Sequence, residues 1–326
     1  MANVVDEAIE GGFVGGVIHP QVTLRERAPA WKRGLRIARN KPLGSFGAII
    51  VLVMLVLAAA PGMFQRYDPG RKFYVPNPAY DPSSTSLYTT NRDATLLEAK
   101  AAPSARHWLG TDETGGDIWA QLVRGARRSL GIGLASMAIA VGAGLVFGVV
   151  SGYFGSWLDT LIQRILDAMQ AFPPLLLLLL IGSAFDLNNR NLVIAFGLIG
   201  CTQVSRLVRA KVLTLRELPF VEAGRVIGAS DMRLMLRHIT PNSLAPAIVI
   251  FTLGLGTVII AEAGLSFLGV VHAANSWGNM LNRGRNLIVS SPWLAVFSGA
   301  AITLAVLAFN LVGDALRDVL DPRLRV

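Results

Sequence analysis

Residues 129–158 read SLGIGLASMAIAVGAGLVFGVVSGYFGSWL and contain no charged side chain. This stretch exceeds the roughly 20 apolar residues that a helix needs to cross the hydrocarbon core of a membrane. Small residues recur within it at every fourth position: Ser136, Ala140, Gly144, Gly148 and Gly152. Such positions share one face of a helix, where a second backbone can approach closely. We therefore predict a membrane-spanning helix with a small packing face, and packing inside the chain is favoured over a subunit interface.

Uncharged runs of similar length lie on both sides of this stretch. They cover residues 43–65, 168–185, 240–261 and 286–313, and a weaker run, 191–205, continues into a basic segment. Hydrophobic residues make up 52% of the chain and charged residues 16%. This composition is too apolar for an ordinary soluble domain of such length. The sequence thus predicts an all-α membrane protein with about six transmembrane helices.

These runs divide the chain into segments. We expect a cytoplasmic N-terminal tail, a first transmembrane helix, an extracytoplasmic loop with a re-entry segment, a five-helix core and a cytoplasmic C-terminal tail, at 1–41, 42–65, 66–125, 126–314 and 315–326. The long loop is rich in Pro, Ser, Thr, Asn and Tyr, a turn-forming composition that does not cross a bilayer. Pro173 and Pro174 predict a bend within the third transmembrane helix.

Basic residues orient the helices. Residues 25–41 are rich in arginine and lysine, with Glu26 as their one acid, so this end is expected in the cytoplasm. About six crossings place the C-terminus there as well. The loop after the fourth span adds a second basic cluster: Arg206, Arg209, Lys211, Arg216, Arg225, Arg233 and Arg237. In contrast, Arg124, Arg127 and Arg128 precede the second span on the predicted outer side.

The formal net charge of +9 arises largely from such clusters beside the spans. Basic flanks anchor helices at lipid headgroups, so we expect the lipid bilayer as a partner and no nucleic acid. Cys201 is expected to be a small packed side chain. Asp112, Glu113 and Asp117 could suggest a metal site, but turn-forming and helix-capping roles are favoured, and no metal site is predicted.

The loop at residues 216–242, RELPFVEAGRVIGASDMRLMLRHITPN, predicts two short helices joined by a tight turn. An apolar side is supplied by Leu218, Val221 and Val226, and Glu222 is spaced to pair with Arg225. Gly228 fits the end of the first helix, because glycine accepts the left-handed conformation there. We expect Ser230 to cap the second helix and Asp231 to favour its dipole. Thr240 and Pro241 are expected to cap and start the fifth span. An ordered bracket of this kind suits docking on another protein.

This loop resembles the EAA loop of binding-protein-dependent ABC importer permeases. Glu222-Ala223-Gly224 is followed by Gly228, six residues after the glutamate, and by Pro241, thirteen further on. Other segments are similar, in the same order, to the second permease of the dipeptide, oligopeptide and nickel subfamily: HWLGTD at 107–112, GYFG at 152–155, GLSFLG at 264–269, SWGNML at 276–281, and the tail from Leu316 to Arg323. The sequence departs from the family pattern at Gly116, Gly224 and Thr240.

The resemblance implies a type I ABC importer transmembrane fold in the bacterial cytoplasmic (inner) membrane. It also implies the partners: a second homologous permease, two ATP-binding subunits and an extracytoplasmic substrate-binding protein. The chain would be a transport subunit for di- or oligopeptides, not an enzyme. ATP and Mg would be held by the partner ATPases, and the chain lacks the phosphate-binding G-x-x-x-x-G-K-[ST] motif. The implied ATPase-coupling residues are Glu222, Ala223, Gly224, Gly228, Ala229, Ser230, Asp231 and Pro241.

Glu262 follows a long uncharged run, so it is a candidate for an intramembrane functional residue, in contact with substrate or paired across helices. Location at the outer interface is an equally weighted reading. An ion-coupled secondary transporter would use membrane carboxylates such as Glu262 and Asp314 and remains the alternative function. It would be expected to show an internal repeat, and none is visible. An intramembrane protease is disfavoured, because G-x-S-x-G and H-E-x-x-H are absent.

Overall fold

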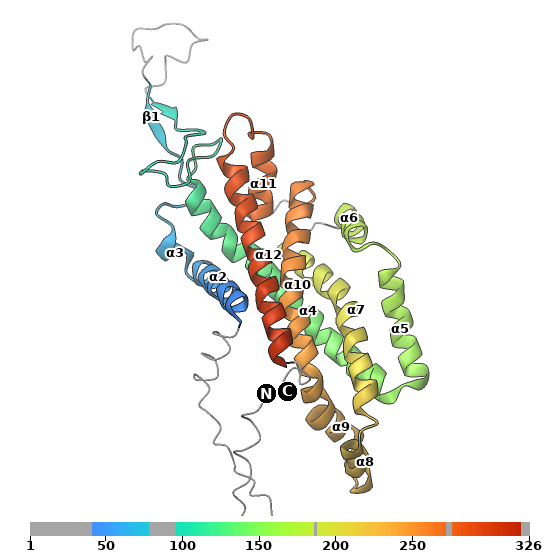
Figure 1. The fold of residues 1–326 in the computed structure, drawn as a ribbon. Helices are drawn as coiled ribbons and strands as arrows, with labels where there is room; N and C mark the ends of the chain where they lie inside the picture. Colours follow the sequence, from blue (N-terminus) through green and yellow to red (C-terminus); the bar gives the residue numbers. More distant parts are fainter. Residues whose placement is uncertain (1–40, 78–94, 186–187, 272–275, 321–326) are drawn as a thin grey trace, which may run out of the picture. The chain divides into compact units, whose positions relative to one another are not determined.

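A computed structural model describes residues 41–77, 95–185, 188–271 and 276–320. Helices dominate it, and Figure 1 shows them side by side as an elongated bundle. The helices are α2 (Pro42–Ala59), α3 (Pro61–Phe64), α4 (Ile118–Phe154), α5 (Ser156–Gln170), α6 (Pro174–Ala184), α7 (Asn189–Leu215), α8 (Pro219–Val226), α9 (Asp231–Leu234), the π-helical turn η2 (Met235–Ile239), α10 (Thr240–Phe267), α11 (Trp277–Arg285) and α12 (Trp293–Leu320). The prediction of an all-α membrane protein is confirmed.

Five helical segments in the described residues are long and apolar enough to cross a membrane, and α9, η2 and α10 together form one of them. A sixth crossing needs α5 and α6 together, and these two helices meet at an angle of 79°. The break falls at residues 171–173, because Pro173 and Pro174 cannot continue an α-helix from the preceding turn. The expected bend is therefore a full break between two helices.

Helix boundaries differ from the predicted segments at several points. The first helix ends at Ala59, before Pro61 starts the short α3, so it is shorter than predicted. The second begins at Ile118, well inside the segment expected to be loop, and its 37 residues extend for about 55 Å. Arg124, Arg127 and Arg128 thus lie in the first turns of a helix longer than the hydrocarbon core. The last helix continues to Leu320 instead of ending near residue 314.

The small face of α4 packs against α7 from Ser136 to Gly152. A Cβ atom placed on Gly144 would lie 2.5 Å from Cβ of Val204, one on Gly148 would lie 2.7 Å from Cβ of Val208, and one on Gly152 would lie 2.9 Å from Cβ of Val212. Both sets recur every four residues, so a row of valines fits a row of glycines. The structure places this contact inside the chain.

The bundle has two distinct ends, which Figure 1 shows. The loop end carries α8, α9 and η2. The hairpin end carries a two-stranded antiparallel sheet of β1 (Tyr74–Pro76) and β2 (Thr95–Leu97), in which Val75 pairs with Leu96. Lys41 Nζ lies 2.5 Å from Asp318 Oδ2, which joins the start of α2 to the end of α12. The described helices therefore begin and end at the same end of the bundle. This agrees with an even number of crossings, which is the count when α5 and α6 together form one crossing.

Asp112 organises the hairpin end. One carboxylate oxygen accepts hydrogen bonds from the backbone N–H groups of Thr114 and Gly116, both at 2.8 Å. The other accepts from Gln121 Nε2 at 2.7 Å and lies 3.1 Å from Arg283 Nη1 of α11. Burial alone raises the pKa of Asp112, but the bonds from Gln121, Gly116 and Thr114 outweigh it and lower the pKa below its ordinary value.

The other two acids of this cluster also have structural partners. Asp117 is the N-cap of α4, where one carboxylate oxygen accepts from the N–H of Ala120 at 2.8 Å. Its other oxygen lies 2.8 Å from Nδ1 of the buried His107. Glu113 pairs with Arg283. The three acids thus fix turns, a helix cap and the docking of α11.

We predict that Asp112→Asn destabilises the protein at neutral pH by about 1–3 kcal/mol, because Gly116, Thr114 and Arg283 lose a charged acceptor. The lowered pKa means that the carboxylate stabilises the fold above its unfolded pKa, and that this stabilisation is lost as the pH falls through the folded pKa. Thermal unfolding of the detergent-purified protein between about pH 3 and pH 7 tests both statements. These statements would be contradicted if the variant unfolded at the same temperature as the unsubstituted protein throughout this pH range.

The glycine and valine rows generate a second prediction. Gly148→Ala should lower the unfolding free energy by about 1–3 kcal/mol, since the new methyl group meets the carbonyl oxygen of Ser205 and Cβ of Val208. Gly142→Ala on the same helix is the matched control, because its Cβ meets no atom within 4 Å. The control should be neutral or slightly stabilising. Equal thermal shifts in the two variants would show that the rows do not hold α4 against α7.

Candidate functional site

The bracket predicted at residues 216–242 is present as α8, a turn, and α9. Gly228 ends α8 with φ +81, in the left-handed region that favours glycine. Its N–H bonds to the carbonyl of Arg225 and the N–H of Ala229 bonds to the carbonyl of Gly224, both at 3.0 Å. This pair of bonds is the Schellman ending of a helix. Gly228 therefore allows the chain to reverse within three residues and start α9 at Asp231.

Apolar side chains anchor the bracket to the loop end. Val221 of α8 and Ile239 of η2 are fully buried, and Leu234 of α9 is nearly so. They form one core cluster with residues of α4, α7, η2 and α10: Val149, Tyr153, Val204, Val208, Val212, Leu215, Met235 and Ala247. Gly224 lies in the same contact, since a Cβ there would be 2.7 Å from Leu234 Cδ2. The valines that pack on the α4 glycines also support the bracket.

Tyr153, at the end of α4, connects both halves of the bracket. Its hydroxyl donates to Asp231 Oδ1 at 2.5 Å, and the guanidinium of Arg225 lies 5.6 Å from the centre of its ring. Arg225 belongs to α8 and Asp231 to the first turn of α9. A displacement of either short helix is therefore transmitted to the end of α4. Sequence reasoning singled out Tyr153 only within the GYFG segment and assigned it no role.

The outward face of the bracket is apolar. Val226 and Ile227 are each 83% exposed, although they flank the turn, and Glu222 and Ala223 are also exposed. More apolar side chains accompany them: Leu218, Phe220, Met232 and Leu236. Exposed apolar side chains gathered on one element are typical of an interaction site. The ion pair predicted between Glu222 and Arg225 is not among those of the described residues, and the guanidinium of Arg225 lies over the ring of Tyr153 instead.

Two predicted caps are wrong. Ser230 occupies the N-cap position of α9, but its side chain makes no capping hydrogen bond. Thr240 is itself helical and caps nothing, because the chain runs without a stop from α9 through η2 into α10. Pro241 has no N–H, and its ring would clash with the carbonyl four residues earlier in a regular α-helix. The π-helical turn at 235–239 accommodates it. One continuous rod thus extends from Asp231 to Phe267.

Ion pairs hold α5 at the loop end. Arg209 of α7 donates two hydrogen bonds to the carboxylate of Asp159 in α5, at 2.6 and 2.5 Å. Arg216 donates to the carbonyl of Gly152 in α4 at 3.1 Å. Arg206 pairs with Asp167. The basic residues at the end of the fourth span therefore face protein carboxylates. Through them, α5 joins the same assembly of α4, α7 and bracket.

A cavity of about 910 Å³ opens where α6 turns away from the bundle. It is bordered by α4, α5, α6, α7 and α10, and its surface is mostly apolar. Polar side chains in its wall are Gln170, Thr202, Gln203, Arg206 and Thr257. Gln170 Nε2 donates to Thr202 Oγ1 at 2.5 Å, which links α5 to α7 across the wall. A few placed polar groups in an apolar wall are typical of a binding or passage site.

Glu262 does not line this cavity. It is 1% exposed and is held by Ser266 Oγ at 2.9 Å and Ser129 Oγ at 3.3 Å. Ser129 in turn accepts from the N–H of Trp277 at 3.3 Å. Glu262 therefore joins α10 to α4 and α11. Of the readings that the sequence left open, the geometry matches pairing across helices.

Residues 144–326 match the family described as binding-protein-dependent transport system inner membrane component. The chain is similar to the dipeptide transport system permease protein DppC of Alkalihalophilus pseudofirmus, with 38% identity over 90% of each protein. It shares 36% identity with the glutathione transport system permease protein GsiD of Escherichia coli, over 90% of this chain and 91% of the relative. A putative peptide transport system permease protein of Brucella suis is 42% identical over 69% of this chain and 76% of its own length.

We predict that Tyr153→Phe loosens the bracket while leaving the bundle folded. The variant loses the hydrogen bond to Asp231, whose carboxylate makes that bond worth about 1.5–3 kcal/mol. Hydrogen exchange of the amides at 224–234 should become faster by about tenfold or more. Tyr74→Phe is the matched control, because Tyr74 lies in the exposed β1 strand. Unchanged exchange at 224–234 would show that Tyr153 does not hold the bracket.

Proposed function

The chain belongs to the family of binding-protein-dependent transport system inner membrane components, and we propose that it is the second permease subunit of an ATP-driven importer for di- or oligopeptides. The observation that carries the proposal is the bracket at 216–242. It is ordered, it is anchored to α4, α7 and α10, and it presents an exposed apolar face. Dipeptide, glutathione and peptide transport permeases are among the chain's relatives, which supports a peptide cargo.

The bracket would receive the movement of a partner ATPase. Glu222, Val226 and Ile227 lie on its exposed side and would touch the partner, whereas Val221 and Leu234 attach it to the bundle. Movement of α8 would reach α4 through Arg225 and Tyr153, and movement of α9 would reach α10 directly along the continuous helix. ATP and Mg would be bound by two partner ATPase subunits, and this chain would supply none of the residues for hydrolysis.

The cavity beside α6 would be this chain's wall of the translocation pathway, and a second homologous permease would supply the other wall. Its apolar surface with Gln170, Gln203 and Thr257 suits a cargo that combines peptide groups with varied side chains. Peptide N–H and carbonyl groups would bond to the amide and hydroxyl side chains. An extracytoplasmic binding protein would deliver the cargo at the hairpin end.

Charge supports this orientation in the bacterial cytoplasmic membrane. The loop end carries Arg206, Arg209, Arg216 and Arg225, and basic residues beside spans favour the cytoplasmic side. Lys41 and Asp318 meet toward the same end, so both termini would leave the bundle on the cytoplasmic side. The hairpin end would then face outward.

Co-purification tests the proposal. The tagged chain is expressed with its neighbouring genes, isolated in detergent and assayed for ATP hydrolysis with and without a peptide-loaded binding protein. Recovery of a second permease and an ATPase, with hydrolysis stimulated by the loaded binding protein, is the expected result. A lone chain that moves peptides into liposomes along an ion gradient without ATP would instead establish the ion-coupled secondary transporter.

Glu222→Gln should reduce stimulated hydrolysis, or recovery of the ATPase with the tag, by about tenfold, which corresponds to the loss of one charged contact of about 1.4 kcal/mol. Its thermal stability should stay native, because the side chain is exposed. Glu217→Gln is the matched control, as Glu217 lies in the same segment with a side chain that is 75% exposed. Equal activity in the two variants would exclude Glu222 from the coupling contact.

A further inference from the structure

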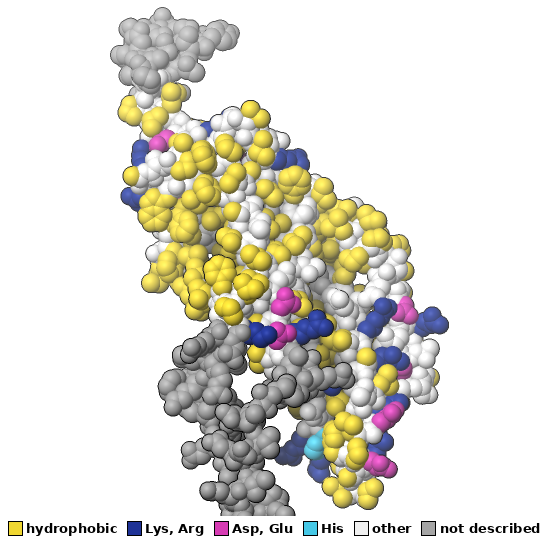
Figure 2. Space-filling view, in the orientation of Figure 1, with side chains coloured by type: hydrophobic (Ala, Val, Ile, Leu, Met, Phe, Trp, Pro, Cys, Tyr) yellow, Lys and Arg dark blue, Asp and Glu magenta, His cyan; other side chains and the backbone are white. Residues whose placement is uncertain are grey.

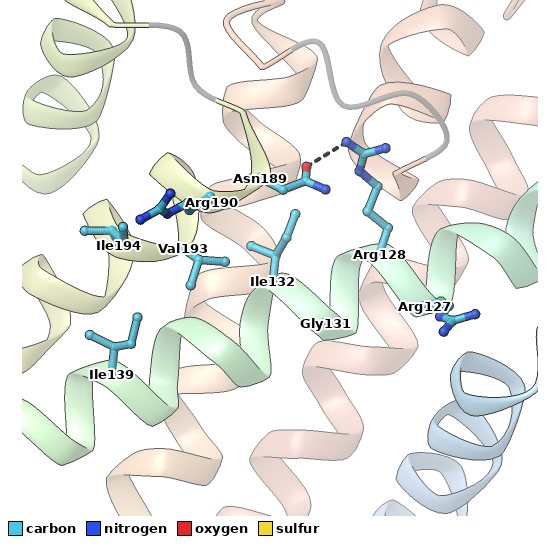
Figure 3. Close-up of a pocket in the computed structure, with 9 residues that line it drawn as sticks. All are labelled: Arg127, Arg128, Gly131, Ile132, Ile139, Asn189, Arg190, Val193 and Ile194. Atoms are coloured by element: carbon cyan, nitrogen blue, oxygen red, sulfur yellow. Dashed lines mark hydrogen bonds between the residues drawn. The ribbon is translucent and has the colours of Figure 1, made fainter.

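A second cavity lies between α4 and α7 near the hairpin end and has no part in the proposed transport path. Its volume is about 510 Å³. Its wall consists of Arg127, Arg128, Gly131, Ile132, Ile139, Asn189, Arg190, Val193 and Ile194. Figure 3 shows Arg128 and Arg190 on either side of Asn189, with Ile132, Val193, Ile194 and Ile139 following along the two helices toward the middle of the bundle. The groove thus has a basic head and an apolar stem.

The basic head lies at the level of a membrane surface. Residues 191–205 of α7 carry no charge, and the rise from Arg190 to Arg206 is about 24 Å, to which the long arginine side chains add at both ends. This length matches the roughly 30 Å of a hydrocarbon core. Arg190 therefore lies where lipid phosphates lie, and the isoleucines and valine of the groove lie where acyl chains lie.

The groove faces away from the central cavity. Ile194 borders the groove and Ile199 borders the central cavity. These positions are five residues apart and so point roughly 140° apart around the helix axis. The groove is accordingly open on a different side of the α4 and α7 pair, where neither α6 nor α10 lines it.

The positively charged arginines of the head favour an anionic ligand. Three arginines and no acidic residue line the groove, and Arg128 donates to Asn189 Oδ1 at 2.6 Å. Arginine side chains at the edge of a bilayer are stabilised by an anionic group, and phosphate accepts several of their N–H donors at once. The apolar stem adds a requirement for a hydrocarbon tail.

We propose that this groove binds one anionic phospholipid, with its phosphate between Arg128 and Arg190 and an acyl chain along Ile132, Val193 and Ile139. Basic pockets between transmembrane helices recognise anionic headgroups in this way. The lipid would lie between α4 and α7 on the hairpin side of the contact between the glycine and valine rows. Its binding is independent of the cargo and of the partner ATPases.

The test uses the full chain in its purified complex, reconstituted in phosphatidylcholine nanodiscs that contain phosphatidylglycerol. Native mass spectrometry counts the phosphatidylglycerol retained on this chain, and thermal unfolding measures its effect on stability. Gly131→Phe fills the groove but keeps both arginines, and a Cβ at Gly131 meets no atom within 4 Å. Gly142→Phe on the same helix is the matched control, because Gly142 has the same free space but does not line the groove.

The amount of retained phosphatidylglycerol should fall by about tenfold in Gly131→Phe and in the double variant Arg128→Gln with Arg190→Gln. It should equal that of the native chain in the two controls, Gly142→Phe and the double variant Arg71→Gln with Arg124→Gln. Phosphatidylglycerol should raise the unfolding temperature of the native chain and of the two control variants, and not that of Gly131→Phe or of Arg128→Gln with Arg190→Gln. Equal retention in Gly131→Phe and Gly142→Phe would overturn the proposal. Stabilisation by inorganic phosphate without lipid would overturn the proposal. So would an oxidant-induced disulfide between Arg190→Cys and a cysteine that replaces an acidic residue of the second permease.

Discussion

Close contact between the glycines of α4 and the valines of α7 is the constraint on which the rest of the molecule depends. In a membrane, helices gain little from the hydrophobic effect when they associate, so close van der Waals packing must hold them. Gly144, Gly148 and Gly152 supply it by leaving room for Val204, Val208 and Val212. Because this contact extends from Ser136 to Gly152, the two helices form one closely packed pair to which the other elements attach.

Each functional feature lies at a definite place on this pair. At the loop end, Val208 and Val212 continue into the core that supports the bracket, and Tyr153 meets Arg225 and Asp231 from the end of α4. On one side, α6 and α10 complete the central cavity. On another side, the groove with the basic head remains open. A shift of α7 against α4 would alter all three places together.

Figure 2 shows the side chains that the packed helices leave on the outside of the bundle. Hydrophobic side chains cover most of the visible face of the bundle, whereas arginines, lysines and acids gather toward the loop end. On α2, Leu43, Phe46, Ile49 and Leu52 are all more than half exposed, as expected for a helix face that contacts a membrane or another protein. Polar groups inside the bundle, such as Glu262 with Ser129 and Ser266, connect helices instead of facing lipid.

The sequence alone determined what depends on local composition and spacing. Uncharged runs predicted the spanning helices, the four-residue repeat predicted a close-packed face, and Gly228 predicted a left-handed turn, because each follows from the chemistry of neighbouring residues. The tertiary structure decided what depends on residues far apart in the chain. Tyr153 reaches Asp231 only because α4 and α7 are packed together, and the cap predicted at Thr240 was wrong because a π-helical turn fuses α9 to α10. The cavity and the groove exist between helices, so no single segment could reveal them.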